Sequence, residues 1–286
     1  MTRIQIPVPE LLSASNPADS LRAEVPPKLV PAIVNAIAVI DALNSTHTGN
    51  ASLAELTAAL GITKSHCHAI LKTLTHAGWL SFEPRLKTYQ LSAGLLASCS
   101  SLVASPEIRR IHERLSKLVE ETGFSCVLTQ PQPDGRFVVL DNIANRNPML
   151  VSFAIGYALP ADSPAHIKAH LAWQPESVRE AWLAAWEPQP YTATTLTSKT
   201  ELRADIEATR KRGYSRSIGE HFDGMLAYGM PIFGRDGTIR YIVALASFVG
   251  QESEAEDQVS KSMLSAAHDI HNSTMASPPA GFPHVV

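Results

Sequence analysis

The sequence predicts a two-part α+β protein, a winged helix-turn-helix domain followed by a second domain in which helices pack on an antiparallel sheet. Three observations predict this fold class. Two short helical patterns meet at Gly61, a strand-turn-strand pattern follows them directly, and the rest of the chain mixes strand-like runs with amphipathic helices. With 286 residues, 45% of them hydrophobic, the chain can bury two cores.

The first helical pattern places Leu53, Leu56 and Leu60 on one face and ends at Gly61, which can adopt a positive φ. Thr63 can cap the second helix. The buried stripe of this helix consists of Cys67, Ile70, Leu71 and Leu74. Two helices joined so tightly must cross at a large angle, which is the helix-turn-helix geometry.

The opposite face of the second helix, with its flanks, carries cations and hydrogen-bond donors but no carboxylate. These residues are Lys64, Ser65, His66, His68, Ala69, Lys72 and His76. Lysine can contact phosphate or guanine, and serine and histidine can reach phosphates or base edges, so this face fits a recognition helix in the DNA major groove. It also fits an ordinary solvated helix face, because helix-turn-helix spacing occurs in domains that bind no DNA.

A β-hairpin, or wing, is predicted directly after this helix. Residues 79–82 and 89–91 form its strands, and Arg85 and Lys87 at its tip are placed to contact DNA phosphate. Residues 61–90 hold four Lys or Arg against one acid, whereas the net charge of the whole chain is −3. The cationic charge is therefore local to the predicted DNA-binding segment.

The segments before the helix-turn-helix are simpler. Residues 1–27, with five prolines and no sustained period, are predicted to be a disordered arm. Residues 31–43 form an apolar helix that completes a three-helix core, and residues 44–52 are predicted to be a loop.

Composition and motifs exclude several classes of function. The apolar runs are too short for a membrane span and the N-terminus lacks the core of a signal peptide, so we expect a cytoplasmic protein with no membrane partner. The three cysteines suggest neither disulfides nor zinc, and the side chains of His66, Cys67 and His68 diverge on a helix, so no metal site is expected. No catalytic motif and no cofactor motif is present, so we predict a non-enzyme. An enzyme built on the second domain and an interaction module that binds no DNA are the alternatives.

The second domain shows five strand-like runs and five helical patterns. The strands are expected at 124–129, 136–142, 149–153, 225–233 and 238–249, and the helices at 108–123, 165–172, 176–186, 199–212 and 254–274. A flexible tail is expected at 276–286.

Several segments together resemble the IclR family of bacterial transcription regulators. VNAIAVIDAL, SLAELTAALGITKSHCHAILKTLTHAGWL and the wing ending YQLS are similar to its N-terminal domain, and IRRIHERLSKLVEETG and YTATTLTSKTELRADIEATRKRGYS are similar to its effector-binding domain. The resemblance covers about residues 29–274. It implies a winged helix-turn-helix domain at 28–92, a linker helix at 93–105 and a GAF-like effector-binding domain at 106–275.

The resemblance also implies an effector site between the loop 156–168 and the paired strands 225–249. Its candidate residues are Gly156, Asp162, Ser163, Ala165, Asp223, Ala227 and Ser247. Asp162 and Ser163 equally fit a role as helix caps, although a helix N-terminus can also bind a carboxylate. The chain departs from the family at Ala69, where relatives usually carry an arginine, and at Ile167, where they often carry a glycine.

Together these features imply a ligand-responsive transcription regulator. We expect a homodimer or tetramer that binds a palindromic double-stranded DNA operator, with half-sites about one helical turn apart or a multiple of it. The expected effector is a small organic acid, including aromatic acids, because Tyr157, Phe222, Tyr228 and Phe248 lie near the predicted site. Whether the protein represses or activates stays open.

Overall fold

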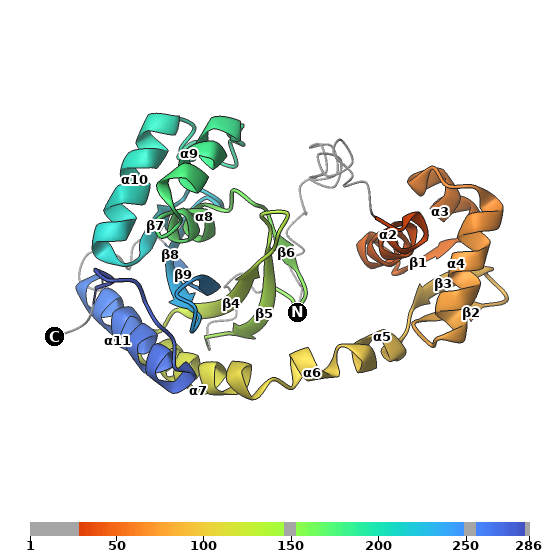
Figure 1. The fold of residues 1–286 in the computed structure, drawn as a ribbon, viewed down its shortest axis with the longest axis horizontal. Helices are drawn as coiled ribbons and strands as arrows, with labels where there is room; N and C mark the ends of the chain where they lie inside the picture. Colours follow the sequence, from red (N-terminus) through yellow and green to blue (C-terminus); the bar gives the residue numbers. More distant parts are fainter. Residues whose placement is uncertain (1–28, 146–152, 249–255, 284–286) are drawn as a thin grey trace. The chain divides into compact units, whose positions relative to one another are not determined.

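The computed structural model describes residues 29–145, 153–248 and 256–283, which divide between two compact units that meet at residues 104 and 105. Figure 1 shows the elements of each unit. The predicted arm at 1–27 lies outside the described residues, as does the predicted strand at 149–153 apart from Phe153, which is not in a strand.

The N-terminal unit is a winged helix-turn-helix domain, as predicted. Its helices are α2 (Pro31–Ser45), α3 (Leu53–Leu60) and α4 (Lys64–His76), and its strands are β1 (Asn50–Ser52), β2 (Leu80–Glu83) and β3 (Thr88–Leu91). The strands form an antiparallel sheet in the order β1-β3-β2. The sequence predicts only loop at β1, because these three residues carry no strand pattern of their own and extend only by pairing with β3.

Local signals set the ends of α3 and α4. Ser52 and Glu55 form a capping box at the start of α3, and Gly61 ends it with φ +64°. The Thr63 hydroxyl accepts a hydrogen bond from the backbone N–H of His66 at the start of α4, as expected. The predicted stripe of α4 is buried together with residues of α2 and α3. The residues of this core include Val39, Leu43, Leu56, Cys67, Ile70, Leu71 and Leu74.

The predicted linker helix is two short helices, α5 (Ala93–Ser98) and α6 (Ser100–Val103), interrupted at Cys99. The residues around the break, Ser98 to Ser101, have low helix propensity. Helix α5 is held against the wing: Trp79 Nε1 donates to Ser98 Oγ at 3.0 Å, and a Cβ added at Gly94 would lie 2.1 Å from the Gly78 carbonyl oxygen.

The C-terminal unit is built on one antiparallel sheet in the order β6-β5-β4-β9-β8-β7. The strands are β4 (Ser125–Pro131), β5 (Phe137–Ile143), β6 (Ala158–Leu159), β7 (Ser215–Ile218), β8 (Met225–Phe233) and β9 (Ile239–Phe248). The sequence predicts the four central strands and misses the two short edge strands, β6 and β7.

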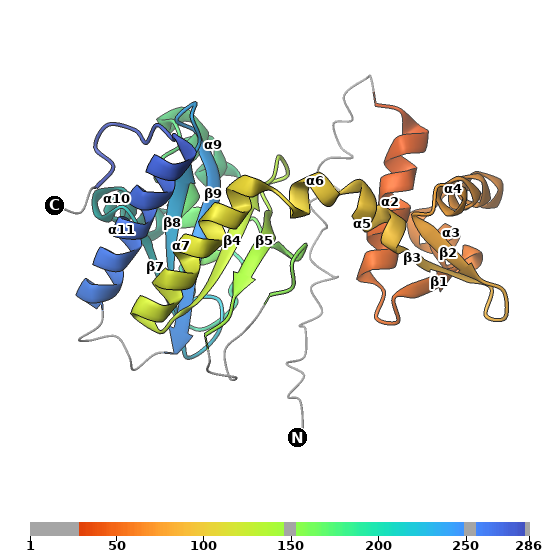
Figure 2. The same cartoon turned by 90° about the horizontal axis from the view of Figure 1, so that it is seen from below.

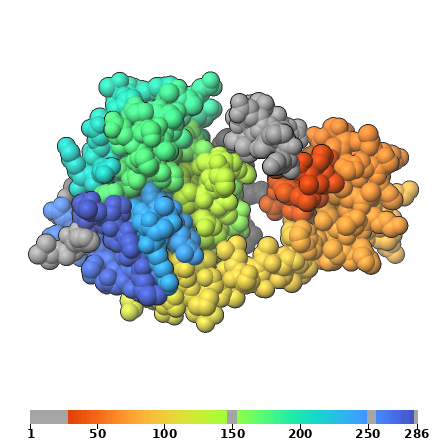
Figure 3. All heavy atoms as spheres, in the orientation of Figure 1, coloured from red at the N-terminus to blue at the C-terminus, as the bar shows by residue number. Residues whose placement is uncertain are grey.

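Helices cover both faces of this sheet. On one face α7 (Pro106–Thr122) and α11 (Glu256–Thr274) lie side by side (Figure 2). The other face carries α8 (Pro164–Leu171), on which α10 (Lys199–Arg212) packs. Together with α9 (Glu176–Ala185), α10 forms the green-to-cyan layer of Figure 3. Side chains alternate along β8, so Leu226 and Tyr228 enter the core beneath α7 and α11 while Ala227 faces α8.

The segment predicted as a flexible tail is packed over its described part. Phe282 is only 3% exposed and its ring lies edge-on to those of Trp173 and Phe233, with centroids 5.2 and 5.3 Å away. Ser277 adds a backbone hydrogen bond to the Gly234 carbonyl. Phe282 therefore holds the described part of a segment whose proline-rich composition predicts no fixed structure.

Candidate functional site

The predicted DNA-contacting residues of α4 share one accessible face. Ser65, Ala69 and Lys72 are exposed along its centre, and Lys64 and His68 are exposed on its flanks. His66 is half-buried. The structure brings these six residues together opposite the buried stripe, and no carboxylate lies on this helix.

The wing places its two cations at the tip. Arg85 and Lys87 are both exposed in the turn between β2 and β3. The Glu83 carboxylate accepts a hydrogen bond from the Arg85 backbone N–H at 3.0 Å, and Lys87 adopts φ +55°, a conformation uncommon for residues other than glycine. The only acid of the wing is thus used in shaping its turn.

A cavity lies between the start of α8 and the sheet of the C-terminal unit. Its empty volume, which includes space open to solvent, is about 660 Å³. Its walls are mainly apolar, with a few serine, asparagine and histidine side chains. They include Ser125, Val127, Asn142, Phe153, Leu159, Ser163, Ala165, His166, Ser217, His221, Phe222, Met225, Ala227 and Ala246.

Three of the seven predicted effector residues, Ser163, Ala165 and Ala227, line this cavity. Gly156 and Asp223 are exposed outside it. Ser247 is buried but lies opposite Leu226 in the β8–β9 register, which places it on the α7 and α11 face of the sheet. The structure therefore separates these seven residues into different surroundings.

Asp162 lies beside the cavity and is engaged elsewhere. Its carboxylate accepts a hydrogen bond from the Tyr191 hydroxyl at 2.6 Å, and burial, together with this contact, raises the pKa of Tyr191. Asp162 does not line the cavity but a smaller hollow on its other side. The role of a side-chain cap, which also fitted Asp162 in the sequence, is not filled, because α8 has no side-chain capping bond.

The start of α8 is open toward the cavity. Ser163 is the N-cap residue, but its hydroxyl lies 3.3 Å from His166 Nδ1 instead of capping the backbone. Ala165 and His166, in the first turn, line the cavity. Since the first N–H groups of a helix have no partner within the helix, this end of α8 presents donors and a partial positive charge.

Sequence reasoning missed two histidines of this cavity, His166 and His221. His166 Nε2 and His221 Nδ1 are buried and have no hydrogen-bond partner within the described structure. Burial lowers the pKa of His166 to about 3, helped by the proximity of His221, and burial also lowers the pKa of His221. The sequence places Ser163 and His166 one helical turn apart, but nothing in it links them to His221.

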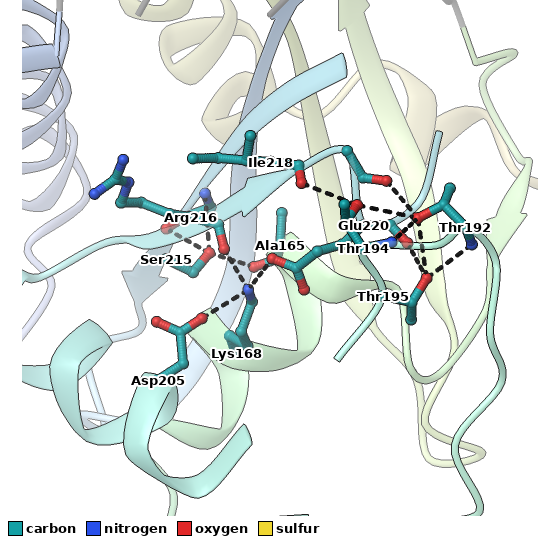
Figure 4. Close-up of polar contacts among 12 residues, drawn as sticks. Ala165, Lys168, Thr192, Thr194, Thr195, Asp205, Ser215, Arg216, Ile218 and Glu220 are labelled. Carbon is teal, nitrogen blue, oxygen red and sulfur yellow. Dashed lines mark hydrogen bonds and ion pairs between the residues drawn. The ribbon is translucent and has the colours of Figure 1, made fainter. Parts of the chain in front are cut away.

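A buried ion-pair cluster holds α8 in place (Figure 4). Lys168, fully buried, lies 2.8 Å from Asp205 Oδ2 and 2.8 Å from Glu220 Oε1, and it also donates to the Arg216 carbonyl. Desolvation raises the pKa of Glu220 and the nearby ammonium of Lys168 opposes that rise. The cluster ties α8 to α10 and to the segment that follows β7.

Close backbone contacts reinforce this position. Ser215 Oγ donates to the Ala165 carbonyl at 2.5 Å, and a Cβ added at Gly229 would lie 2.2 Å from that same oxygen. Thr192 and Thr195 donate to the carbonyls of Gly219 and Glu220, both at 2.6 Å (Figure 4). These contacts fix the two segments that carry His166 and His221.

Comparison with known proteins identifies both units. Residues 32–84 match the family described as "IclR helix-turn-helix domain", and residues 100–272 match "Bacterial transcriptional regulator IclR C-terminal". The chain belongs to the IclR family of bacterial transcription regulators. It therefore combines a helix-turn-helix DNA-binding domain with a C-terminal effector domain, and its relatives are transcriptional regulators rather than enzymes.

Several individual IclR proteins are similar to it. The HTH-type transcriptional regulator XynR of Escherichia coli (strain K12) is 25% identical over 230 residues, covering 80% of this chain and 90% of XynR. The crystal structure of an IclR regulator from Alicyclobacillus acidocaldarius aligns with a TM-score of 0.75 at 22% identity, over 85% and 98% of the two chains. The crystal structure of an IclR homolog from Microbacterium hydrocarbonoxydans, solved with 4-hydroxybenzoate, aligns with a TM-score of 0.72 at 16% identity. The alignment covers 86% of this chain and 100% of that homolog.

The described residues also bear on metal and membrane roles. They contain no group of three or more His, Cys, Asp or Glu side chains suited to hold a metal ion. Within them, no helix combines the length and apolar character that a bilayer crossing requires.

Proposed function

We propose that this IclR-family regulator binds a palindromic operator as a homodimer or tetramer and changes its operator affinity when a small organic acid enters the cavity of its C-terminal unit. It acts in the cytoplasm, where its DNA lies. The observation that carries the proposal is the cavity itself, an apolar space onto which an uncapped helix start opens.

The N-terminal unit supports the DNA half of the proposal. Lys64, Lys72, Arg85 and Lys87 are exposed on the recognition helix and wing. Lysine and arginine there contact phosphate, whereas Ser65, His66 and His68 are placed to contact phosphates or base edges. Ala69 offers only a methyl group, which fits an apolar contact with a thymine methyl.

Exposed apolar side chains on α2 support assembly with a second copy. Ile33 and Ile37 are 59% and 54% exposed, and they lie one turn apart on the same side of the helix. Contiguous apolar surface of this kind marks protein interaction sites. A two-fold pair of winged-helix domains would place two α4 helices in successive major grooves, which requires a palindromic operator.

The cavity supports an organic acid as effector. A helix N-terminus binds carboxylates, and the first turn of α8 faces the cavity through Ala165 and His166. Phe153, Phe222 and Met225 form an apolar wall suited to a hydrocarbon or aromatic body. The aromatic acid 4-hydroxybenzoate, bound to the Microbacterium homolog, is the first candidate to try.

The proposal is tested with the full chain. DNA selected from a random pool by the purified protein should contain inverted repeats, and binding should weaken as salt rises. Adding benzoate, 4-hydroxybenzoate or pyruvate should change the affinity for the selected DNA. A pool without enrichment would contradict the operator claim, and an unchanged affinity with every acid would contradict the claim that an acid is the effector.

A further inference from the structure

The two unpartnered histidine nitrogens of the cavity have no evident structural purpose. His166, on α8, is 4% exposed, and His221 lies in the turn between β7 and β8. Both side chains line the same cavity, and His166 Nε2 and His221 Nδ1 are buried without a hydrogen-bond partner in the described structure. A buried polar atom without a partner is destabilising, so a ligand that satisfied these atoms would recover that cost.

The described walls of the cavity carry no permanent positive charge that would balance a bound anion. Among the described residues, no lysine, arginine or acidic side chain lines it. Lys168, two residues after His166 on α8, is already paired with Asp205 and Glu220. A carboxylate in this cavity would therefore meet the α8 N-terminus and two neutral imidazoles, but no permanent cation.

Other titratable groups lie near the pair. Asp162 raises the pKa of His221, though less than burial lowers it, and Asp162 itself receives the Tyr191 hydroxyl. His170, on the same helix, is also kept neutral by burial, which lowers its pKa to about 4. The thiol of Cys126, on β4, is neutral because burial raises its pKa, and its side chain packs in the core on the opposite face of the sheet. None of these groups supplies a positive charge at neutral pH.

We propose that the cavity takes up its organic acid together with one proton, which His166 and His221 hold against the ligand carboxylate. The proposal rests on the proposed function, in which the effector is an organic acid. A proton from water binds one of the unpartnered nitrogens, an N–H bond forms there, and the resulting imidazolium pairs with the carboxylate. No bond to the ligand forms or breaks.

The physical reason is charge neutralisation. Burying an unpaired carboxylate in apolar surroundings is costly, and a neighbouring opposite charge favours the charged form of both partners. A bound carboxylate therefore favours a protonated imidazole, whereas the cavity without a ligand favours two neutral ones. Ligand affinity becomes dependent on pH through these two residues.

The test is titration calorimetry of the full chain with benzoate, 4-hydroxybenzoate and pyruvate, in phosphate and in Tris at the same pH. The two buffers differ in ionisation enthalpy, so the difference in heat gives the number of protons taken up. We expect about one proton per acid bound, and an affinity that falls by up to about tenfold for each unit that the pH rises within the range where this proton is taken up. Acid binding without proton uptake would overturn the proposal and leave the proposed function standing, whereas no acid binding at all would overturn both.

Three variants assign the proton. H166Q and, separately, H221Q should lower the proton uptake and flatten the pH dependence of affinity. H170Q is the matched control, because it removes a buried imidazole from the same helix that does not line the cavity. Full proton uptake in both H166Q and H221Q, or its loss in H170Q, would overturn the assignment to this pair.

Discussion

The ammonium group of Lys168 lies 2.8 Å from the carboxylate of Glu220, and this contact sets the positions of both cavity histidines. His166 precedes Lys168 by two residues on α8, and His221 directly follows Glu220. The buried ion pair therefore joins the two segments from which the histidines reach the cavity. The same ion pair therefore contributes to the stability of the C-terminal unit and to the positions of the two histidines.

Replacing Lys168 with methionine should destabilise the C-terminal unit strongly. Removing one partner of a buried ion pair leaves uncompensated charge, here on Glu220, at a cost of about 3–5 kcal/mol, whereas Asp205 keeps its ion pair with Arg212. Urea unfolding measures the loss. Lys211, exposed on α10, gives the control K211A, which should change the unfolding free energy by less than about 0.5 kcal/mol. Equal effects of the two substitutions would show that the cluster contributes nothing.

Lys72 and Arg85 should each bind a DNA phosphate. K72A and R85A should weaken DNA binding, and each should reduce the steepness of its salt dependence by about one unit, because fewer counterions are released. Fluorescence anisotropy with a labelled duplex at several salt concentrations measures both. K211A, a lysine of the other unit, should leave the slope unchanged. A slope that is unaltered in K72A and R85A would remove these residues from the interface.

Acid should destabilise the protein through its buried histidines. An imidazole in the unfolded chain has a pKa near 6.5. Burial lowers the pKa of His166 to about 3 and that of His170 to about 4. The unfolded chain therefore binds more protons below about pH 6.5, and the unfolding free energy should fall as pH drops from there toward 4.

Urea unfolding at pH 7.5, 6 and 5 measures this dependence, and H170Q should make it shallower. The exposed His47 gives the control H47Q, which should reproduce the parent profile. A parent stability that stays constant from pH 7.5 to 5 would contradict the account of these buried imidazoles.

Phe282 should stabilise the C-terminal unit. Its ring packs against Trp173, Phe233 and His271, so F282A should cost about 3–5 kcal/mol, the usual range for a buried phenylalanine. Thermal unfolding of the C-terminal unit measures the loss. F82A removes the same side chain from an exposed position of the other unit and should leave this transition in place. An unchanged transition in F282A would mean that Phe282 does not hold the tail against the C-terminal unit.

The sequence predicts the elements whose signals are local. The stripe of α4, the cap at Thr63 and the turn at Gly61 all lie within a few residues of one another, and the structure shows each of them. Strand β1 is missed because it is three residues long and becomes extended only by pairing with β3, which is distant from it in the chain. Strand β7 is missed because its four residues are too few to show a strand pattern before they pair with β8. Such pairing leaves little trace in the segment itself.

The cavity shows the same limit. The family resemblance points to Ser163 and Ala165 on the loop that opens α8 and to Ala227 on its strand, and these three residues line the cavity. The face of the sheet on which Ser247 lies could not be predicted, because it depends on the register with Leu226. His221 is brought to His166 by a turn more than fifty residues later in the chain, fixed by the Lys168 cluster. The sequence pattern of either segment therefore gives no indication that the two histidines lie close together.

The central claim, that an acid in the cavity controls operator binding, is tested most directly by operator affinity with and without the acid. The measurement uses the full chain, a selected operator and a saturating acid, with A246F as a variant that fills the cavity. The account predicts a change in operator affinity of about 5–150-fold in the parent and none in A246F. An operator affinity that is the same with and without an acid shown to bind would contradict it.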